Sequence, residues 1–192
     1  MKNSIKNLAI IAVVAFITFS FTEISKEKKE IKTENSKVVW KGYKVTGSHA
    51  GTIDLQTGSL TFSEDKLVGG EFTINMASIT NTDLEGDYKG KLEGHLKSDD
   101  FFGVEKNPTA TLFFTKVKST GKNSYKVTGD LTIKGITNKV IFDLSVYGNK
   151  ASASLKIDRS KFNVKYGSTS FFDNLKDKAI YDEFDLIVDL EF

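Results

Sequence analysis

Apolar and polar residues alternate with a period of two through most of the chain after Lys37, and this pattern constrains the fold more than any other feature. Such alternation places every second side chain on one face of a β-strand, so that one face is buried while the other meets water. The clearest example is the segment 184–192, in which apolar residues alternate with acids at almost every position. Because the pattern recurs in about eight segments, the sequence predicts an all-β protein.

Short segments rich in glycine, asparagine, serine and aspartate separate the predicted strands. The expected turns are Thr57-Gly58, Ser63–Lys66, Gly121–Ser124, Gly135–Asn138 and Gly148-Asn149. Strands joined by such tight turns are antiparallel neighbours. A sheet of this kind removes both exposed edges only by closing on itself. We therefore favour an antiparallel barrel of about eight strands over a two-sheet sandwich, with one helix and one long loop, within 81–108 and 160–182, closing its ends.

The segment 81–108 interrupts the alternation with a helical pattern. Thr82 and Glu85 have the spacing of a capping box. Leucine or tyrosine recurs at 84, 88, 92 and 96, which places these side chains in one band of a helix. Glycine recurs at 86, 90 and 94, and each glycine costs about 1 kcal/mol of helix stability relative to alanine. We expect a helix over 84–97 that depends on tertiary contacts, with the glycine strip open to another backbone.

The first residues have the pattern of a secretory signal peptide. Lys2 and Lys6 precede an apolar run over residues 8–21, which is shorter than the roughly 18 to 20 residues of a membrane-spanning helix. We predict a signal peptide over 1–22, with an uncleaved anchor as the alternative, then a charged linker over 23–36 and a barrel domain over 37–192. A periplasmic or secreted location follows, with no stable membrane span after processing.

Charge and composition argue against several kinds of partner and site. The chain has 27 basic and 25 acidic residues, so the loss of Lys2 and Lys6 would balance the two and leave no basic excess for nucleic acid. Cysteine is absent, which excludes disulfides and lipid acylation of a cysteine. His49 and His95 lack the spacing of a zinc site. We predict no metal and no cofactor, and we keep a homodimer as an open hypothesis.

Three separated blocks of the sequence resemble the YceI-like family of bacterial envelope proteins. They are SITNTDLEGDYKGKLEGHLKSDDFFGVEKNPTATL (78–112), GDLTIKGITNKV (129–140) and DRSKFNVKYGSTSFFDNLKDKAIYDEF (158–184). The likeness covers nearly all of the chain from about Val38 to Phe192. It implies an extended eight-stranded antiparallel barrel similar to lipocalins, an apolar pore that binds a polyisoprenoid lipid, and a periplasmic or secreted location.

An antiparallel barrel directs the apolar side of each strand inward. The residues that we predict to line the pore are Phe72, Ile74, Leu112, Phe114, Leu131, Phe142, Leu144, Leu186 and Val188. Periodicity does not decide whether these side chains line a tunnel or interlock into a solid core. A pore of this composition suits an isoprenoid tail, because the tail gains affinity from apolar area removed from water.

The two long excursions supply candidate residues for the mouth of the pore, namely His95, Phe101, Phe102 and Arg159. We expect His95 to form a hydrogen bond at the mouth, and Phe101 and Phe102 to gate it. Arg159 is the only arginine. Its planar guanidinium is suited to a carboxylate or a phosphate, so its partner is either a nearby acid such as Asp158 or Asp173, or a pyrophosphate head group.

These patterns lead to the hypothesis of a binding protein without catalytic activity. It would bind a long-chain isoprenoid lipid of polyprenyl or quinone type and carry or store it in the periplasm. One alternative is an enzyme that acts on such a lipid, with His95, Asp99 and Arg159 as candidate catalytic residues. The other is a structural or stress-related envelope protein whose barrel is solid.

Overall fold

The computed structural model describes residues 25–192, and the predicted signal peptide lies outside the described residues. The strands are β1 (Lys26–Glu30), β2 (Lys37–Lys44), β3 (Gly47–Ser63), β4 (Lys66–Asn81), β5 (Thr109–Ser119), β6 (Ser124–Ile133), β7 (Ile136–Tyr147), β8 (Lys150–Asp158) and β9 (Ile180–Glu191). The helices are α1 (Gly86–Lys97) and the short 3-10 helices η1 (Thr33–Asn35), η2 (Arg159–Phe162) and η3 (Lys176–Lys178). None of the helices in this part of the chain combines the length and hydrophobicity needed to cross a bilayer.

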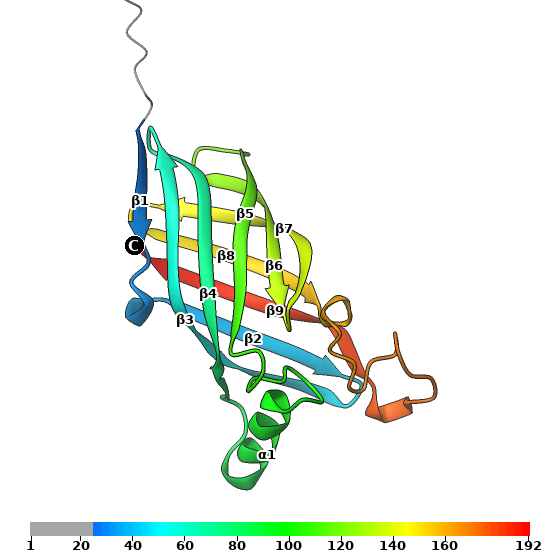
Figure 1. Cartoon of the computed structure of the whole chain (residues 1–192). Coiled ribbons are helices and arrows are strands. Elements are labelled where there is room, and N and C mark those ends of the chain that lie inside the picture. The colour runs from blue at the N-terminus through cyan, green and yellow to red at the C-terminus, as the bar shows by residue number, and fades with distance from the viewer. Residues whose placement is uncertain (1–24) are drawn as a thin grey trace, which may run out of the picture.

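The strands β2 to β9 form one closed antiparallel barrel (Figure 1). Neighbours follow the order β3-β2-β9-β8-β7-β6-β5-β4, and β4 pairs again with β3. Every pairing is antiparallel, as the short connections require. The prediction of an all-β, eight-stranded antiparallel barrel with one helix is therefore confirmed.

Two of the hairpin turns contain residues with a left-handed backbone. Positive φ angles occur at Glu64 and Asp65 between β3 and β4, and at Lys134 and Gly135 between β6 and β7. The prediction of a turn at Thr57-Gly58 is wrong, because both residues lie inside β3.

Gly58 serves a different purpose. A methyl group at this position would come within 2.7 Å of the Phe72 ring. Glycine therefore allows an inward-facing ring to lie against the backbone of the neighbouring strand. A register irregularity between Leu55 and Thr57 accompanies this close approach.

Part of the segment 23–36, for which a linker was predicted, forms regular secondary structure. Residues 26–30 form β1, which pairs with β3 from Lys26 opposite Ser63 to Glu30 opposite Ser59. The side chains of β1 are mostly exposed, so backbone hydrogen bonds to β3 hold the strand, with little help from apolar burial. A strand held in this way has no apolar alternation, which is why the sequence pattern did not reveal it.

The helix begins later than the capping-box pattern suggested. Glu85 occupies the N-cap of α1 and makes no capping hydrogen bond with its side chain. Asn81 instead accepts a hydrogen bond from the Leu84 backbone N–H at 2.8 Å. Glu93, on the second turn of the helix, accepts hydrogen bonds from the Asn81 N–H at 2.8 Å and from the Thr80 hydroxyl. These contacts fix α1 to the end of β4.

Only part of the predicted apolar band of α1 is buried. Leu96 is buried and Leu92 packs against the core, whereas Tyr88 is 74% exposed. A methyl group at Gly90 or Gly94 would have no neighbour within 4 Å. The glycine strip thus faces open space, which contradicts the expectation that another backbone approaches it, and nothing in the packing requires glycine there.

Replacing Gly90 and Gly94 by alanine should stabilise the protein, since alanine favours helix and the sites are open. The expected gain is up to about 1 kcal/mol per site in the free energy of unfolding, measured by urea denaturation. Gly58→Ala is the matched control and should destabilise, because its methyl group would meet the Phe72 ring. A loss of stability in the helix variants would contradict the packing described here.

The anchoring of α1 should depend on pH. The hydrogen bond from Thr80, followed by that from Asn81, lowers the pKa of Glu93 below its ordinary value of 4.5. The charged form is favoured in the folded state, so its stabilisation is complete above pH 4.5 and is lost as the pH falls through the folded pKa. Glu93→Gln should reduce the free energy of unfolding at pH 7 by about 1 kcal/mol and have a smaller effect at pH 3. Equal effects at both pH values would contradict this assignment.

Candidate functional site

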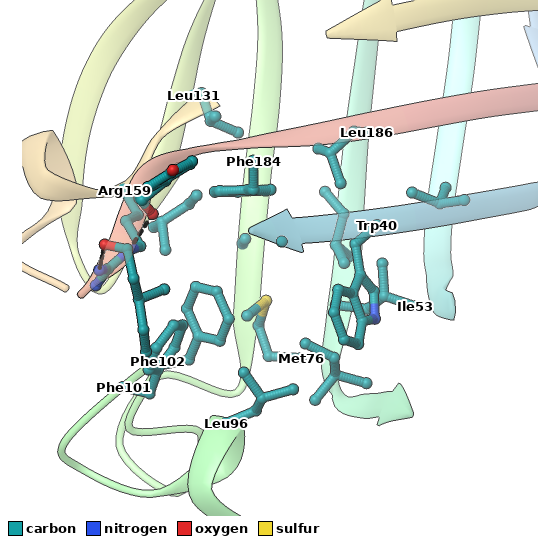
Figure 2. Close-up of a pocket in the computed structure, with 18 residues that line it drawn as sticks. Trp40, Ile53, Met76, Leu96, Phe101, Phe102, Leu131, Arg159, Phe184 and Leu186 are labelled. Atoms are coloured by element: carbon teal, nitrogen blue, oxygen red, sulfur yellow. Dashed lines mark hydrogen bonds between the residues drawn. The ribbon is translucent and has the colours of Figure 1, made fainter. Parts of the chain in front are cut away.

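An apolar cavity occupies the end of the barrel next to α1 (Figure 2). It encloses about 130 Å³ of space into which a water-sized sphere fits. Strands β2 to β6 and β9 supply most of its wall, and α1, the segment 98–104 and η2 supply the rest. The lining residues are Val38, Trp40, Gly42, Ile53, Ile74, Met76, Ile79, Leu96, Phe101, Phe102, Ala110, Leu131, Ile133, Arg159, Ile180, Tyr181, Phe184 and Leu186.

The opposite half of the barrel is filled by aromatic rings. The ring of Phe114 lies 5.6 Å from that of Phe72 and 5.7 Å from that of Phe142, measured between centroids. Val127 and Leu144 are buried beside them. Gly70 makes room for this packing, because a methyl group there would come within 2.8 Å of the Phe114 ring. Rings that interlock in this way leave little space between them.

Smaller or more flexible inward residues explain why the other half is hollow. Gly42 and Ala110 line the cavity with little side-chain volume, and Met76 contributes an unbranched chain. Phe184 and Leu186 face the same space (Figure 2) and are only half-buried, although they belong to a barrel strand. An inward side chain that keeps accessible surface indicates unfilled space beside it.

Three of the nine predicted pore residues line the cavity. Ile74, Leu131 and Leu186 line the cavity. The other six are not part of the cavity lining and belong to the apolar core or pack against it; they are Phe72, Leu112, Phe114, Phe142, Leu144 and Val188. Trp40, Met76 and Phe184 line the cavity without having been predicted. Each stands in an alternating segment, but alternation reports the face of a strand and carries no information about position along the barrel axis.

Phe101 and Phe102 form part of the cavity wall below the barrel end. Their rings are 5.0 Å apart in an edge-to-face arrangement, and both residues are buried. The loop that carries them is held by backbone hydrogen bonds, including Gly103 N–H to the Ser98 carbonyl at 2.8 Å. Lys134 adds a hydrogen bond from its ammonium group to the Phe101 carbonyl at 2.7 Å. The two rings thus form part of the cavity wall, and their role as a gate stays a prediction.

Arg159 is 2% exposed and lines the cavity, yet its guanidinium is directed to the backbone. It donates hydrogen bonds to the carbonyls of Val164 at 2.9 Å, Ile180 at 2.9 Å and Tyr181 at 3.2 Å. The nearby acid is Asp182, at 3.5 Å, and not one of the two acids suggested by the sequence. Burial lowers the pKa of Arg159, and Asp182 offsets part of this shift. The residue thereby connects η2 to the start of β9.

His95 packs against the Phe101 ring and is not part of the cavity lining. Its ring is 5.7 Å from the Phe101 ring and 4.3 Å from that of Tyr166. The Nε2 atom is buried and has no hydrogen-bond partner among the described residues. His95 therefore supports the cavity wall by ring packing, where the sequence suggested a hydrogen bond. Within residues 25–192, no three histidine, cysteine or acidic residues are arranged to hold a metal ion.

Comparison with known proteins gives a consistent result. Residues 30–192 match the family model of the YceI-like domain. A UPF0312 protein of Photorhabdus laumondii is 33% identical over 134 residues, which cover 62% of this chain and 66% of the relative. The chain thus spans less than two thirds of the length of the curated relatives that it matches, and only 45% of a UPF0312 protein of Azotobacter vinelandii.

Two solved structures share the fold. BcnA of Burkholderia cenocepacia has a TM-score of 0.68 and 24% identity, with 83% of this chain and 98% of that chain covered. A protein of Saccharophagus degradans, described as a polyisoprenoid binding domain implicated in plant cell wall breakdown, has a TM-score of 0.58 and 13% identity. In that comparison 88% of this chain and 97% of the other are covered.

The division of the barrel into a filled and a hollow half can be tested with two phenylalanine variants. Phe114→Ala should cost about 3–5 kcal/mol of unfolding free energy, as expected for a ring removed from a packed core. Phe184→Ala should cost less than half as much, because its ring already borders empty space. Urea denaturation measures both values, and equal costs would show that the two halves are packed alike.

Proposed function

The chain belongs to the YceI-like family, and we propose that it binds a long-chain isoprenoid lipid, of polyprenyl or quinone type, with the tail in the apolar cavity. The observation that carries the proposal is the cavity itself, whose lining residues are apolar apart from Arg159 and the phenol of Tyr181. The charge of Arg159 is already engaged by three carbonyls. The description of the Saccharophagus degradans structure as a polyisoprenoid binding domain adds support.

The volume of the cavity requires the protein to open when a long tail binds. A cavity of roughly 150 Å³ holds one benzene molecule in another protein, and the cavity here encloses about 130 Å³. The closed form thus has space for about one small apolar group. A longer tail needs the displacement of Leu96, Phe101 and Phe102, which close the end of the barrel next to α1. Apolar burial at about 25 cal/mol per Å² would drive this opening.

Binding without chemistry agrees best with the side chains around the cavity. The enzyme alternative names His95, Asp99 and Arg159. His95 and Asp99 do not line the cavity, and Arg159, which does, has its guanidinium bonded to three backbone carbonyls. The solid-barrel alternative fits only the half filled by Phe72, Phe114 and Phe142. Periplasmic carriage or storage is part of the proposal and rests on the signal peptide predicted from residues 1–22.

The test is native mass spectrometry of the protein purified from its own host, followed by extraction into organic solvent. We expect one apolar adduct of defined mass on the wild-type protein. Leu186→Trp should abolish the adduct by filling the cavity. Ile187→Trp, at the adjacent residue that is 50% exposed on the outer face, should keep it. Absence of an adduct on the wild type, or its retention in both variants, would contradict the proposal.

A further inference from the structure

A second hollow lies outside the barrel mouth, between the segment 98–104, the β6–β7 turn and the loop that follows η2. It is an open groove of about 560 Å³. Three lysines line it, Lys134, Lys165 and Lys178, together with the acids Asp99 and Asp100. The groove shares no lining residue with the apolar cavity.

We propose that this groove binds the phosphate or pyrophosphate head group of an isoprenoid lipid whose tail occupies the cavity. The inference rests on the proposed function and narrows its ligand to an anionic polyprenyl lipid in preference to a quinone. Lysine ammonium groups are suited to phosphate oxygens. A neutral quinone head offers no charge to match them.

Residues that line the cavity are hydrogen-bonded directly to residues that line the groove. The Phe101 ring lines the cavity, while its carbonyl accepts a hydrogen bond from Lys134 of the groove. Ile180 also lines the cavity, and its N–H donates to the carbonyl of Gly167 in the groove at 2.8 Å. Displacement of Phe101, which a long tail requires in any case, would therefore join cavity and groove. A lipid with its tail inside would then present its head to the lysines.

The charges of the groove favour an anion. Lys134, Lys165 and Lys178 have no carboxylate within 4.0 Å among the described residues. Asp99, by contrast, forms an ion pair with Lys106, which compensates its charge. Of the two acids in the groove lining, only Asp100 has no ion pair with a lysine among the described residues, whereas the lining contains three lysines. The net charge of the groove lining is therefore positive, although the net charge of the whole chain is close to zero.

The experiment compares geranylgeranyl diphosphate with geranylgeraniol, which share one tail and differ in the head. Trp40 is the only tryptophan and lines the cavity, so its fluorescence reports tail binding for both ligands. We expect the diphosphate to bind about tenfold more tightly at low salt. The advantage should shrink as salt screens the lysines. Inorganic pyrophosphate, added as a competitor, should weaken diphosphate binding and leave alcohol binding unchanged.

Two double variants locate the effect. Lys165→Gln with Lys178→Gln should remove the advantage of the diphosphate and leave the affinity for the alcohol unchanged. Lys161→Gln with Lys176→Gln is the matched control, since it removes the same charge from the same segment outside the groove. This control variant should still bind the diphosphate more tightly than the alcohol, by most of the wild-type difference.

The outcomes separate the inference from the proposed function. Equal affinity for the diphosphate and the alcohol would overturn the head-group site and leave the lipid-binding function standing. Equal losses in the two double variants would also overturn it, because the effect would then be one of net charge. If neither ligand changes the emission of Trp40, the proposed function is contradicted and the inference falls with it.

Discussion

Hydrogen bonds between β3 and β4 join the two ends of the sheet, so that the inward faces of the barrel strands meet around one axis. A barrel of this size has an interior that side chains can either fill or leave open for one small ligand. The volume of the inward side chains at each position along the barrel axis decides whether the interior there is filled or hollow. Rings from Phe72, Phe114 and Phe142 interlock at one end, whereas Gly42 and Ala110 at the other end leave the space empty. The cavity is therefore a consequence of closure combined with an uneven distribution of volume.

The two structures that cover the open end are held in different ways. The segment after β8 is fixed by Arg159, because a buried guanidinium is tolerated only when its donors are paired, and three carbonyls supply the pairing. The other cover, α1 with its following loop, is fixed by Glu93 and by the burial of Leu96. A lipid that displaces Leu96 and its neighbours separates the Phe101 ring from the Arg159 guanidinium, which lies 5.3 Å from the ring centroid. The three hydrogen bonds of Arg159 to backbone carbonyls stay in place on this route into the barrel.

Much of the fold could be predicted from the sequence, because closure and strand direction follow from period-two alternation and short turns. The position of the cavity could not, since alternation at Phe72 and at Phe184 looks the same although one ring is in the filled half and the other borders the hollow. The edge strand β1 was missed because its backbone pairing needs no apolar residues. The sequence predicted either an acid or a lipid head group as the partner of Arg159. The actual acceptors are backbone carbonyls, which every residue has, so residue types cannot reveal them.

The central claim is that an isoprenoid tail enters the barrel at its hollow end and occupies the apolar cavity there. Met76 lines this cavity and is the only methionine in the described residues, so a carbon-13 label on methionine methyl groups places a single reporter there. Solution NMR with geranylgeraniol tests the claim most directly. The account predicts intermolecular NOEs between the Met76 methyl group and the methyl groups of the tail. An unchanged Met76 signal in a sample that has bound the lipid would contradict it.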